Sequence, residues 1–412
     1  MPTPAPAAIG PDLQEQQPHV RIGPALLVVL ALLAGIAPFA TDMYLPAFPE
    51  MVSDLATTPS GVQLSLTTFL VGAGIGQLVF GPLSDRIGRR RPLVVGMVLY
   101  VVASAIAALA PTIGVLIGAR LVQGMAGAAG MVISRAIITD LTRGAAAARA
   151  MSVVMLISGV APVLAPVAGS VLADPIGWRG LLWVVTALVA VGLVATLAVV
   201  RETRPPAVQS PEHQPSSASK AAELTSRAYL GNMLSYVLAF TSMMAYISAS
   251  PFLYQTMVGL SEVQYGLVFG LNALALMIVG GLSARLTRRF RVESLARTGL
   301  LINVAAVAAF GVLVLTTEPS LWLAVPILVS VGSLGLVFGN TTARALASVP
   351  TATGLGSAIL GMLQHVLAGA VAPIVSIGGG TTAVPLAITM LVASIAANIA
   401  LAFSRGADRS TV

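Results

Sequence analysis

Two charged residues interrupt stretches of the chain that are otherwise strongly apolar. Asp42 is the only carboxylate well inside such a stretch, and Arg120 lies inside another. A charged side chain at the depth of a lipid bilayer is costly and is a functional candidate by default. Loss of water favours the protonated form of a carboxyl group, whereas a neighbouring guanidinium favours the ionised form. We therefore predict that Asp42 binds and releases a coupling proton, with Arg120 beside it as the second residue of the coupling site. The alternatives are a structural ion pair and an Asp42 side chain that extends to the outer interface beside Pro46.

A second group of charges lies in residues 81–93, which read GPLSDRIGRRRPL. A carboxylate such as Asp85 can cap the N-terminus of a neighbouring helix or pair with arginines. Asp140 is a further acidic partner for Arg86 or Arg89. The spacing predicts a charged joint between helices, and the alternative is that these arginines only fix the orientation of the chain in a membrane.

The elements that position these residues are predicted to be membrane-spanning helices. The chain has 412 residues, of which 57% are hydrophobic and only 9% are charged, whereas about 25% of the residues of a soluble domain are charged. A helix needs about 20 apolar residues to cross a bilayer. Twelve segments meet this requirement: 25–45, 62–81, 92–110, 113–138, 150–172, 181–200, 229–251, 263–283, 295–315, 321–342, 354–376 and 382–402.

The basic residues give these spans an orientation. On alternate loops, nearly all arginines outside the spans fall on one side, and Arg179 alone falls on the other. Cytoplasmic loops carry an excess of Lys and Arg, so we expect both chain ends in the cytoplasm. The excess of arginine over lysine is typical of a GC-rich genome and indicates a bacterium, so we expect the bacterial cytoplasmic (inner) membrane. The positive net charge is thus topological, and we expect no nucleic-acid partner.

The chain also contains an internal repeat. GPLSDRIGRRRP (81–92) aligns with GGLSARLTRRFR (280–291), and both lie between the second and third spans of a six-span half. Such a spacing predicts a parallel pseudo-repeat of two six-helix bundles in an all-α polytopic membrane protein. The predicted parts are a disordered tail (1–21), an N-terminal bundle (22–200), a cytoplasmic linker (201–227), a C-terminal bundle (228–403) and a second tail (404–412).

Several motifs carry a resemblance to a known family. The 81–93 loop matches the signature G-x-L-S-D-R-x-G-R-R of the major facilitator superfamily. Further motifs resemble the Bcr/CflA group of drug–proton antiporters within it: TDMYLPAFP (41–49), LIGARLVQGMAGAA (116–129), APVLAPVAGS (161–170) and GLGSAILGMLQ (354–364).

The resemblance implies roles for these motifs. A first-span acid and a fourth-span arginine commonly couple proton and drug in this group. The signature loop resembles a latch that stabilises the outward-facing state, and the fifth-span motif is typical of antiporters. Ala34 stands where some relatives carry another acid, so we expect neutral or weakly polar substrates.

The candidate residues fall into three further sets. The latch set is Gly81, Asp85, Arg86, Gly88, Arg89, Arg90 and Asp140. The antiporter-motif set, which suits close helix contact and a kink, is Ala161, Pro162, Ala165, Pro166 and Gly169. Polar or soft residues expected to face a central substrate cavity are Tyr44, Gln123, Met243, Met244, Tyr246, Asn272, Asn340, Gln364 and His365. A hydrogen-bonded helix contact is the alternative for His365.

Enzyme classes find no support in the chain. The only lysine, Lys220, has no phosphate-binding glycine loop around it, the three histidines are scattered, and cysteine is absent. We expect a monomeric proton-driven exporter of small antibiotics that needs no cofactor or metal and whose partners are its substrate and the lipid bilayer. The alternatives are a proton-coupled metabolite carrier on the same scaffold and, more remotely, a membrane receptor that transports nothing.

Overall fold

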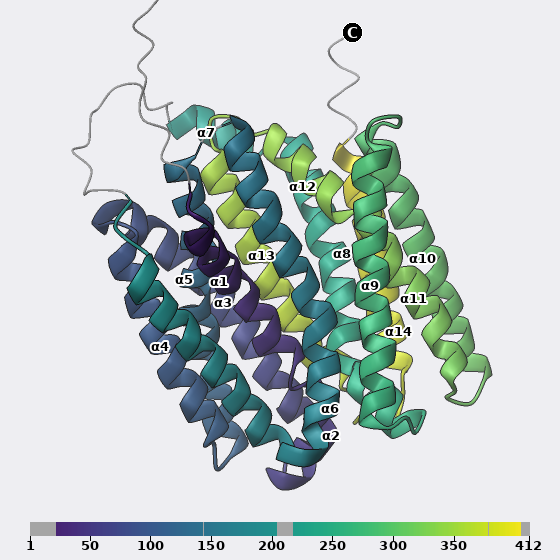
Figure 1. Cartoon of the computed structure of the whole chain (residues 1–412). Coiled ribbons are helices and arrows are strands. Elements are labelled where there is room, and N and C mark those ends of the chain that lie inside the picture. Colours follow the sequence, from purple (N-terminus) through teal and green to yellow (C-terminus); the bar gives the residue numbers. More distant parts are fainter. Residues whose placement is uncertain (1–21, 143, 204–216, 378, 405–412) are drawn as a thin grey trace, which may run out of the picture.

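The computed structural model of the chain describes residues 22–142, 144–203, 217–377 and 379–404, and within these ranges the regular structure is entirely helical (Figure 1). The helices in chain order are α1 (Pro24–Asp42), η1 (Leu45–Ala47), α2 (Phe48–Asp54), α3 (Pro59–Ile87), α4 (Arg90–Ala108), α5 (Ile113–Leu141), α6 (Gly144–Val199), α7 (Ser217–Leu224), α8 (Arg227–Pro251), η2 (Phe252–Met257), α9 (Glu262–Leu286), α10 (Val292–Thr316), η3 (Leu321–Leu323), α11 (Ala324–Ser333), η4 (Leu334–Leu336), α12 (Phe338–Ala347), α13 (Thr353–Val375) and α14 (Val384–Phe403).

Eleven helical segments of the described ranges are long and apolar enough to cross a membrane. The longest contains two helices, because Gly177 adopts a non-helical backbone conformation with φ 64° and ψ 175°. This positive φ is readily available only to glycine. The predicted spans 150–172 and 181–200 are therefore separate crossings, and α11 and α12 together form the crossing predicted at 321–342. The sequence prediction of an all-α protein with twelve spans is confirmed.

Polar side chains define where several of these helices begin. Thr58 and Thr112 accept hydrogen bonds from backbone N–H groups in the first turns of α3 and α5. Ser226 does the same for α8, and Ser261 forms a capping box with Gln264 at the start of α9. These side chains satisfy N–H groups that no helical carbonyl can reach.

The crossings pack as two groups, here called the first half (α1 to α6) and the second half (α8 to α14). The halves meet along two helix pairs, α3 with α13 and α6 with α9. A short helix, α7, lies inside the predicted linker 201–227, and residues 204–216 of that linker are outside the described ranges. The predicted tail 1–21 is also outside them, as is the second tail apart from Ser404.

The two ends of the helix bundle differ in charge. We call the end that carries the 87–91 loop and the described ends of the chain the basic end; α7 lies at this end (Figure 1). At the opposite end the halves are bonded to each other. Gln255 Nε2 donates to the Pro46 carbonyl oxygen at 2.8 Å, and the hydroxyls of Ser60 and Ser376 are 2.5 Å apart. Between described residues, no hydrogen bond or ion pair joins the halves at the basic end.

Small residues allow the helices of the first half to approach closely. Gly124 of α5 faces the backbone of α3, and a Cβ atom there would overlap the carbonyl oxygen of Phe69. Small residues at helix crossings are the usual means of close packing in membranes. Gly118, in the same helix, has no atom within 4 Å of the corresponding position.

We predict that Gly124→Ala destabilises the protein and that Gly118→Ala does not. Overpacking against the α3 backbone costs about 1–3 kcal/mol, whereas Ala at an open helical position gains roughly 0.5–1 kcal/mol over Gly. Thermal unfolding followed by size-exclusion chromatography in detergent measures both variants against the parent protein. Equal melting temperatures for the two variants would show that the α3–α5 contact is looser than the structure has it.

Candidate functional site

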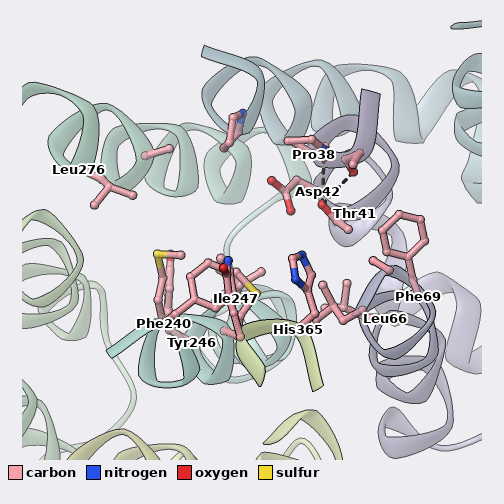
Figure 2. Close-up of a pocket in the computed structure, with 18 of the residues that line it drawn as sticks. Pro38, Thr41, Asp42, Leu66, Phe69, Phe240, Tyr246, Ile247, Leu276 and His365 are labelled. Carbon is pink, nitrogen blue, oxygen red and sulfur yellow. Dashed lines mark hydrogen bonds between the residues drawn. The ribbon is translucent and has the colours of Figure 1, made fainter. Parts of the chain in front are cut away.

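A cavity of about 240 Å³ lies between the two halves. Its volume is slightly below the ~300–1,000 Å³ typical of small-molecule sites. The lining is mostly apolar and comes from both halves (Figure 2). Apolar lining residues include Leu66, Phe69, Leu70, Phe240, Met243, Met244, Ile247, Phe269, Leu276 and Val331.

Asp42 is the only carboxylate among the described residues that line the cavity. It is the last residue of α1, its exposed fraction is 7%, and its side chain points into the cavity (Figure 2). The neighbouring Thr41 also lines the cavity, but its hydroxyl donates back to the carbonyl oxygens of Ala37 and Pro38 in α1. Asp42, which the sequence analysis singled out as a charge at membrane depth, therefore lies on the wall of the cavity.

Arg120 lies behind this wall and not on it. The side chain is completely buried, with the guanidinium carbon 4.4 Å from the ring centre of Tyr44 and 4.5 Å from that of Phe69. Its Nη2 donates to the Ala40 carbonyl oxygen at 2.8 Å, and its Nη1 donates to Gln123 Oε1 at 2.6 Å. In the described structure Arg120 forms neither a hydrogen bond nor an ion pair with Asp42. The structural ion pair that the sequence offered as an alternative is therefore not formed in this state.

Six of the nine predicted cavity residues line the cavity, and all six come from the second half: Met243, Met244, Tyr246, Asn272, Gln364 and His365. Two of them are joined to each other, since Asn272 Nδ2 donates to the Tyr246 hydroxyl at 2.6 Å. The result is a soft apolar wall with a few fixed polar groups.

The other three predicted cavity residues lie elsewhere. Tyr44 is buried and its hydroxyl is 3.0 Å from that of Ser65, while Gln123 joins Arg120 to Ser104. Asn340 donates to the Ser283 hydroxyl at 3.0 Å within the second half. Each forms hydrogen bonds that hold neighbouring helices together, and the prediction that these three face the cavity is corrected.

His365 links the halves across the cavity. Its Nδ1 is 2.7 Å from the Gly361 carbonyl oxygen and 3.3 Å from the side-chain nitrogen of Gln77 in α3. One ring nitrogen cannot serve both partners at once: with a hydrogen on Nδ1 it donates to Gly361 within α13, and without one it accepts from Gln77. His365 lines the cavity, as predicted, and the Gln77 contact provides the predicted alternative, a hydrogen-bonded helix contact, in the second tautomer. Gln77 was not identified from the sequence, because nothing in its span marks which helix face meets the other half.

The 161–170 motif packs against both halves. A Cβ atom on Gly169 would overlap the carbonyl oxygen of Met43, just after α1, and the Pro166 carbonyl faces Gly266 of α9. Ala161 and Ala165 are buried, and Pro162 lines the cavity. The predicted close helix contact is present, and within α6 the only non-helical backbone angles occur at Gly177 and not at the prolines.

The 81–93 loop is organised around Arg89, whose exposed fraction is 4%. Its Nε donates to Asp140 at 2.8 Å, and its Nη1 donates to both Asp85 and Ser84 at 2.8 Å. Burial alone lowers the pKa of the Arg89 guanidinium, but the hydrogen bonds and charges of Asp140 and Asp85 outweigh it and raise the pKa. Arg89 therefore remains a cation that ties the end of α3 to the end of α5.

Other members of the predicted latch set have different positions. Gly88 has φ 92°, which ends α3 in a conformation that favours glycine. Arg86 and Arg90 are exposed, and Gly81 is partly buried. The side chain of Asp140 is 17% exposed and that of Asp85 is 54% exposed, so the Asp140 pair is the better shielded of the two.

Glu202 adds a contact that the sequence did not reveal. Its carboxylate oxygens accept hydrogen bonds from the backbone N–H groups of Arg89 and Arg90, at 2.7 and 3.1 Å. A carboxylate at this place complements the positive N-terminal end of α4. The start of the predicted linker is thereby attached to the same loop.

Comparison with known proteins identifies the type of molecule. The family model of the major facilitator superfamily matches residues 30–373. An uncharacterised transporter of this type from Bacillus subtilis is 34% identical over 91% of this chain and 94% of its own length. A bicyclomycin resistance protein homolog of Haemophilus influenzae is 25% identical over 88% of this chain and 92% of its own.

A solved structure shows the same fold. The crystal structure of a D-xylose–proton symporter superposes with a TM-score of 0.72 at 14% identity, covering 92% of this chain and 97% of the other. These proteins are transporters and not enzymes, in agreement with the sequence analysis. The chain belongs to the major facilitator superfamily and is a multi-pass membrane transporter.

Proposed function

We propose that this transporter exports small antibiotics of the chloramphenicol or bicyclomycin kind in exchange for protons, as a Bcr/CflA-type antiporter. The observation that carries the proposal is Asp42, the one carboxylate among the described residues that line an apolar cavity shared by both halves. The drug-resistance name of the Haemophilus relative supports the direction of transport and the substrate class. Its home is the bacterial cytoplasmic membrane, and the basic end faces the cytoplasm.

One acid serves proton and substrate in turn. An ionised carboxylate is unfavourable in an apolar site without water, so Asp42 keeps its proton while the empty cavity is closed. When the basic end opens, water enters, Asp42 releases its proton to the cytoplasm, and a substrate binds beside the ionised carboxylate through hydrogen bonds. When the opposite end opens, the substrate leaves and Asp42 binds a proton from outside. Export of substrate and inward movement of protons are coupled because Asp42 binds either the substrate or the proton.

The structure supports a state that is closed at the opposite end. The bonds Gln255–Pro46 and Ser60–Ser376 lie there. Alternating access requires that these bonds break while contacts form at the basic end, by movement along the α3–α13 and α6–α9 pairs. The latch role of the 81–93 loop belongs to that second state, since here its bonds between described residues stay within the first half and the start of the linker.

The cavity favours substrates with little charge. Its lining is largely aliphatic, aromatic and methionine side chains, which adapt to varied apolar ligands. Ala34, where some relatives carry a second acid, is buried in α1 and adds no charge. A metabolite carrier on the same scaffold is the second candidate, and a receptor without transport is the third; neither explains a drug-resistance relative.

We predict that Asp42→Asn abolishes active export while leaving the protein folded and inserted. The amide keeps the shape of the carboxylate but cannot exchange a proton, so proton-driven transport should fall at least ~10-fold. The measurement is a susceptibility panel in an efflux-deficient bacterial host, together with drug flux in vesicles carrying an imposed pH gradient. Equal amounts of protein in the membrane are verified by immunoblot.

Glu318→Gln provides the matched control, since Glu318 is an exposed carboxylate in the loop before η3 at the opposite end. It should confer the same protection as the parent protein. Protection that survives in Asp42→Asn would place the coupling group elsewhere. No protection against any compound would favour the metabolite carrier.

We also predict that Asp85→Asn slows transport several-fold without reducing the amount of protein in the membrane. The amide weakens the charge pair between residue 85 and Arg89 but leaves the better shielded pair between Arg89 and Asp140. The protein therefore stays folded, while the contact that the 81–93 loop makes during transport is weakened. Drug flux in vesicles measures the rate. The control is Arg91→Gln, because Arg91 is exposed and takes no part in the bonds between Arg89, Asp85 and Asp140. Equal transport rates for the two variants would indicate that the loop only fixes the orientation of the chain in the membrane.

A further inference from the structure

Arg135 lies in α5 near the basic end, where a long charged side chain commonly extends to the membrane interface. The structure shows another environment. Arg135 follows Met131 by four residues, so both lie on the same face of α5, and Met131 lines the cavity. Arg135 is exposed and one turn closer to the basic end. It therefore lies at the mouth of the cavity.

Two groups of the other half lie within reach of the Arg135 charge. They are Tyr236 of α8 and His365 of α13, each of which interacts electrostatically with the guanidinium. A guanidinium directed to lipid would not come within range of both. Arg135 thus faces the space between the halves, on the path from the basic end to the cavity.

Tyr236 belongs to an aromatic wall, formed with Phe240 and Phe338, that continues to the cavity. The ring of Tyr236 stacks on Phe240 with centres 6.2 Å apart, and Phe338 is 5.3 Å from Tyr236. Phe240 is also 6.5 Å from His365, and both line the cavity. The Tyr236 hydroxyl donates to Gln364 Oε1 at 3.0 Å, so its ring is held in place. The wall is continuous with the cavity lining.

The charge of Arg135 has no protein counter-ion within the described ranges, where no ion pair to it occurs. The ionisable groups that face the same space are Tyr236 and His365, and Asp42 lies further in, on α1. A cation within a membrane-spanning segment that no carboxylate neutralises is a site for an anion from outside the protein. A guanidinium matches a carboxylate through two parallel hydrogen bonds.

We propose that Arg135 and the wall of Tyr236, Phe240 and Phe338 form a mouth subsite for a substrate with one anionic group on an aromatic body. This inference rests on the proposed function and specifies its substrates further: an amphiphilic aromatic acid binds more tightly than a neutral relative of the same shape. The anionic group pairs with Arg135, the ring packs on the wall, and the apolar remainder extends into the cavity.

The test is a binding measurement with two probes of the same shape. Anthracene-9-carboxylate and anthracene-9-carboxamide are titrated by fluorescence into the purified full chain in phosphatidylcholine nanodiscs. The parent protein should bind the acid about 10-fold more tightly than the amide. Arg135→Gln should lose this preference and bind the amide within about twofold of the parent value. Arg135→Lys, which keeps the charge, should retain part of the preference.

Arg297→Gln is the matched control, because it removes the same charge from an exposed position of α10, a helix that contributes no residue to the cavity. It should preserve the preference for the acid. Unchanged amide binding shows that Arg135→Gln is folded. The proposal is overturned if the parent protein binds both probes equally, or neither, or if Arg135→Gln keeps the preference.

The binding test is independent of transport. It needs neither a proton gradient nor export, so a protein that prefers the acid but confers no drug protection would retain the subsite and lose the proposed function. Drug protection without a preference for the acid would do the reverse.

Discussion

The hydrogen bond from Arg120 to the carbonyl oxygen of Ala40 determines how the end of α1 is placed. A guanidinium buried in an apolar bundle must use its donors on the protein itself. Arg120 uses them on Ala40 and Gln123 and lies between two aromatic rings. Asp42 follows Ala40 by two residues, so the bond that stabilises the buried guanidinium also holds the backbone that carries the cavity carboxylate. Phe69 links Arg120 to the cavity, since its ring contacts the guanidinium and also lines the cavity.

This arrangement separates two tasks that a direct ion pair would combine. A carboxylate in contact with a guanidinium would be held ionised, and a proton could displace the pair only at a high cost. Arg120 donates to two neutral acceptors, Ala40 and Gln123, and only its buried Nε lacks a partner in the described structure. A change in the charge of Asp42 therefore breaks no bond of Arg120. The buried arginine supports the site mechanically, and in the proposed mechanism the proton chemistry belongs to Asp42.

Much of the fold was predictable from the sequence, for a physical reason. The bilayer requires an uninterrupted apolar run for each crossing, and loops with arginines separate the runs, so the twelve spans and the repeat of 81–92 could be recognised. The site residues with a clear signal were those that break a rule: Asp42 and Arg120 as charges in apolar segments, and the arginine loop with Gly88.

Side-chain orientation had no such signal. A membrane helix is apolar on all faces, so polar residues that bond helices together, such as Gln123 and Asn340, resemble those that line a cavity. Gln77 and Arg135 depend on which helices of the other half face them, which only the three-dimensional structure provides.

The two proposals place opposite charges at the two ends of one cavity. Asp42 lies on the wall formed by α1 and His365 on the wall formed by α13, and the proposed subsite of Arg135 lies towards the basic end. In the proposed exchange Asp42 carries its proton when the substrate has left, and a bound substrate meets the ionised carboxylate. An anionic group is then kept away from Asp42 by like charge and drawn to Arg135, so a bound molecule has a preferred orientation. The proposed exchange and the proposed subsite are therefore linked, because the charge of one carboxyl group enters both.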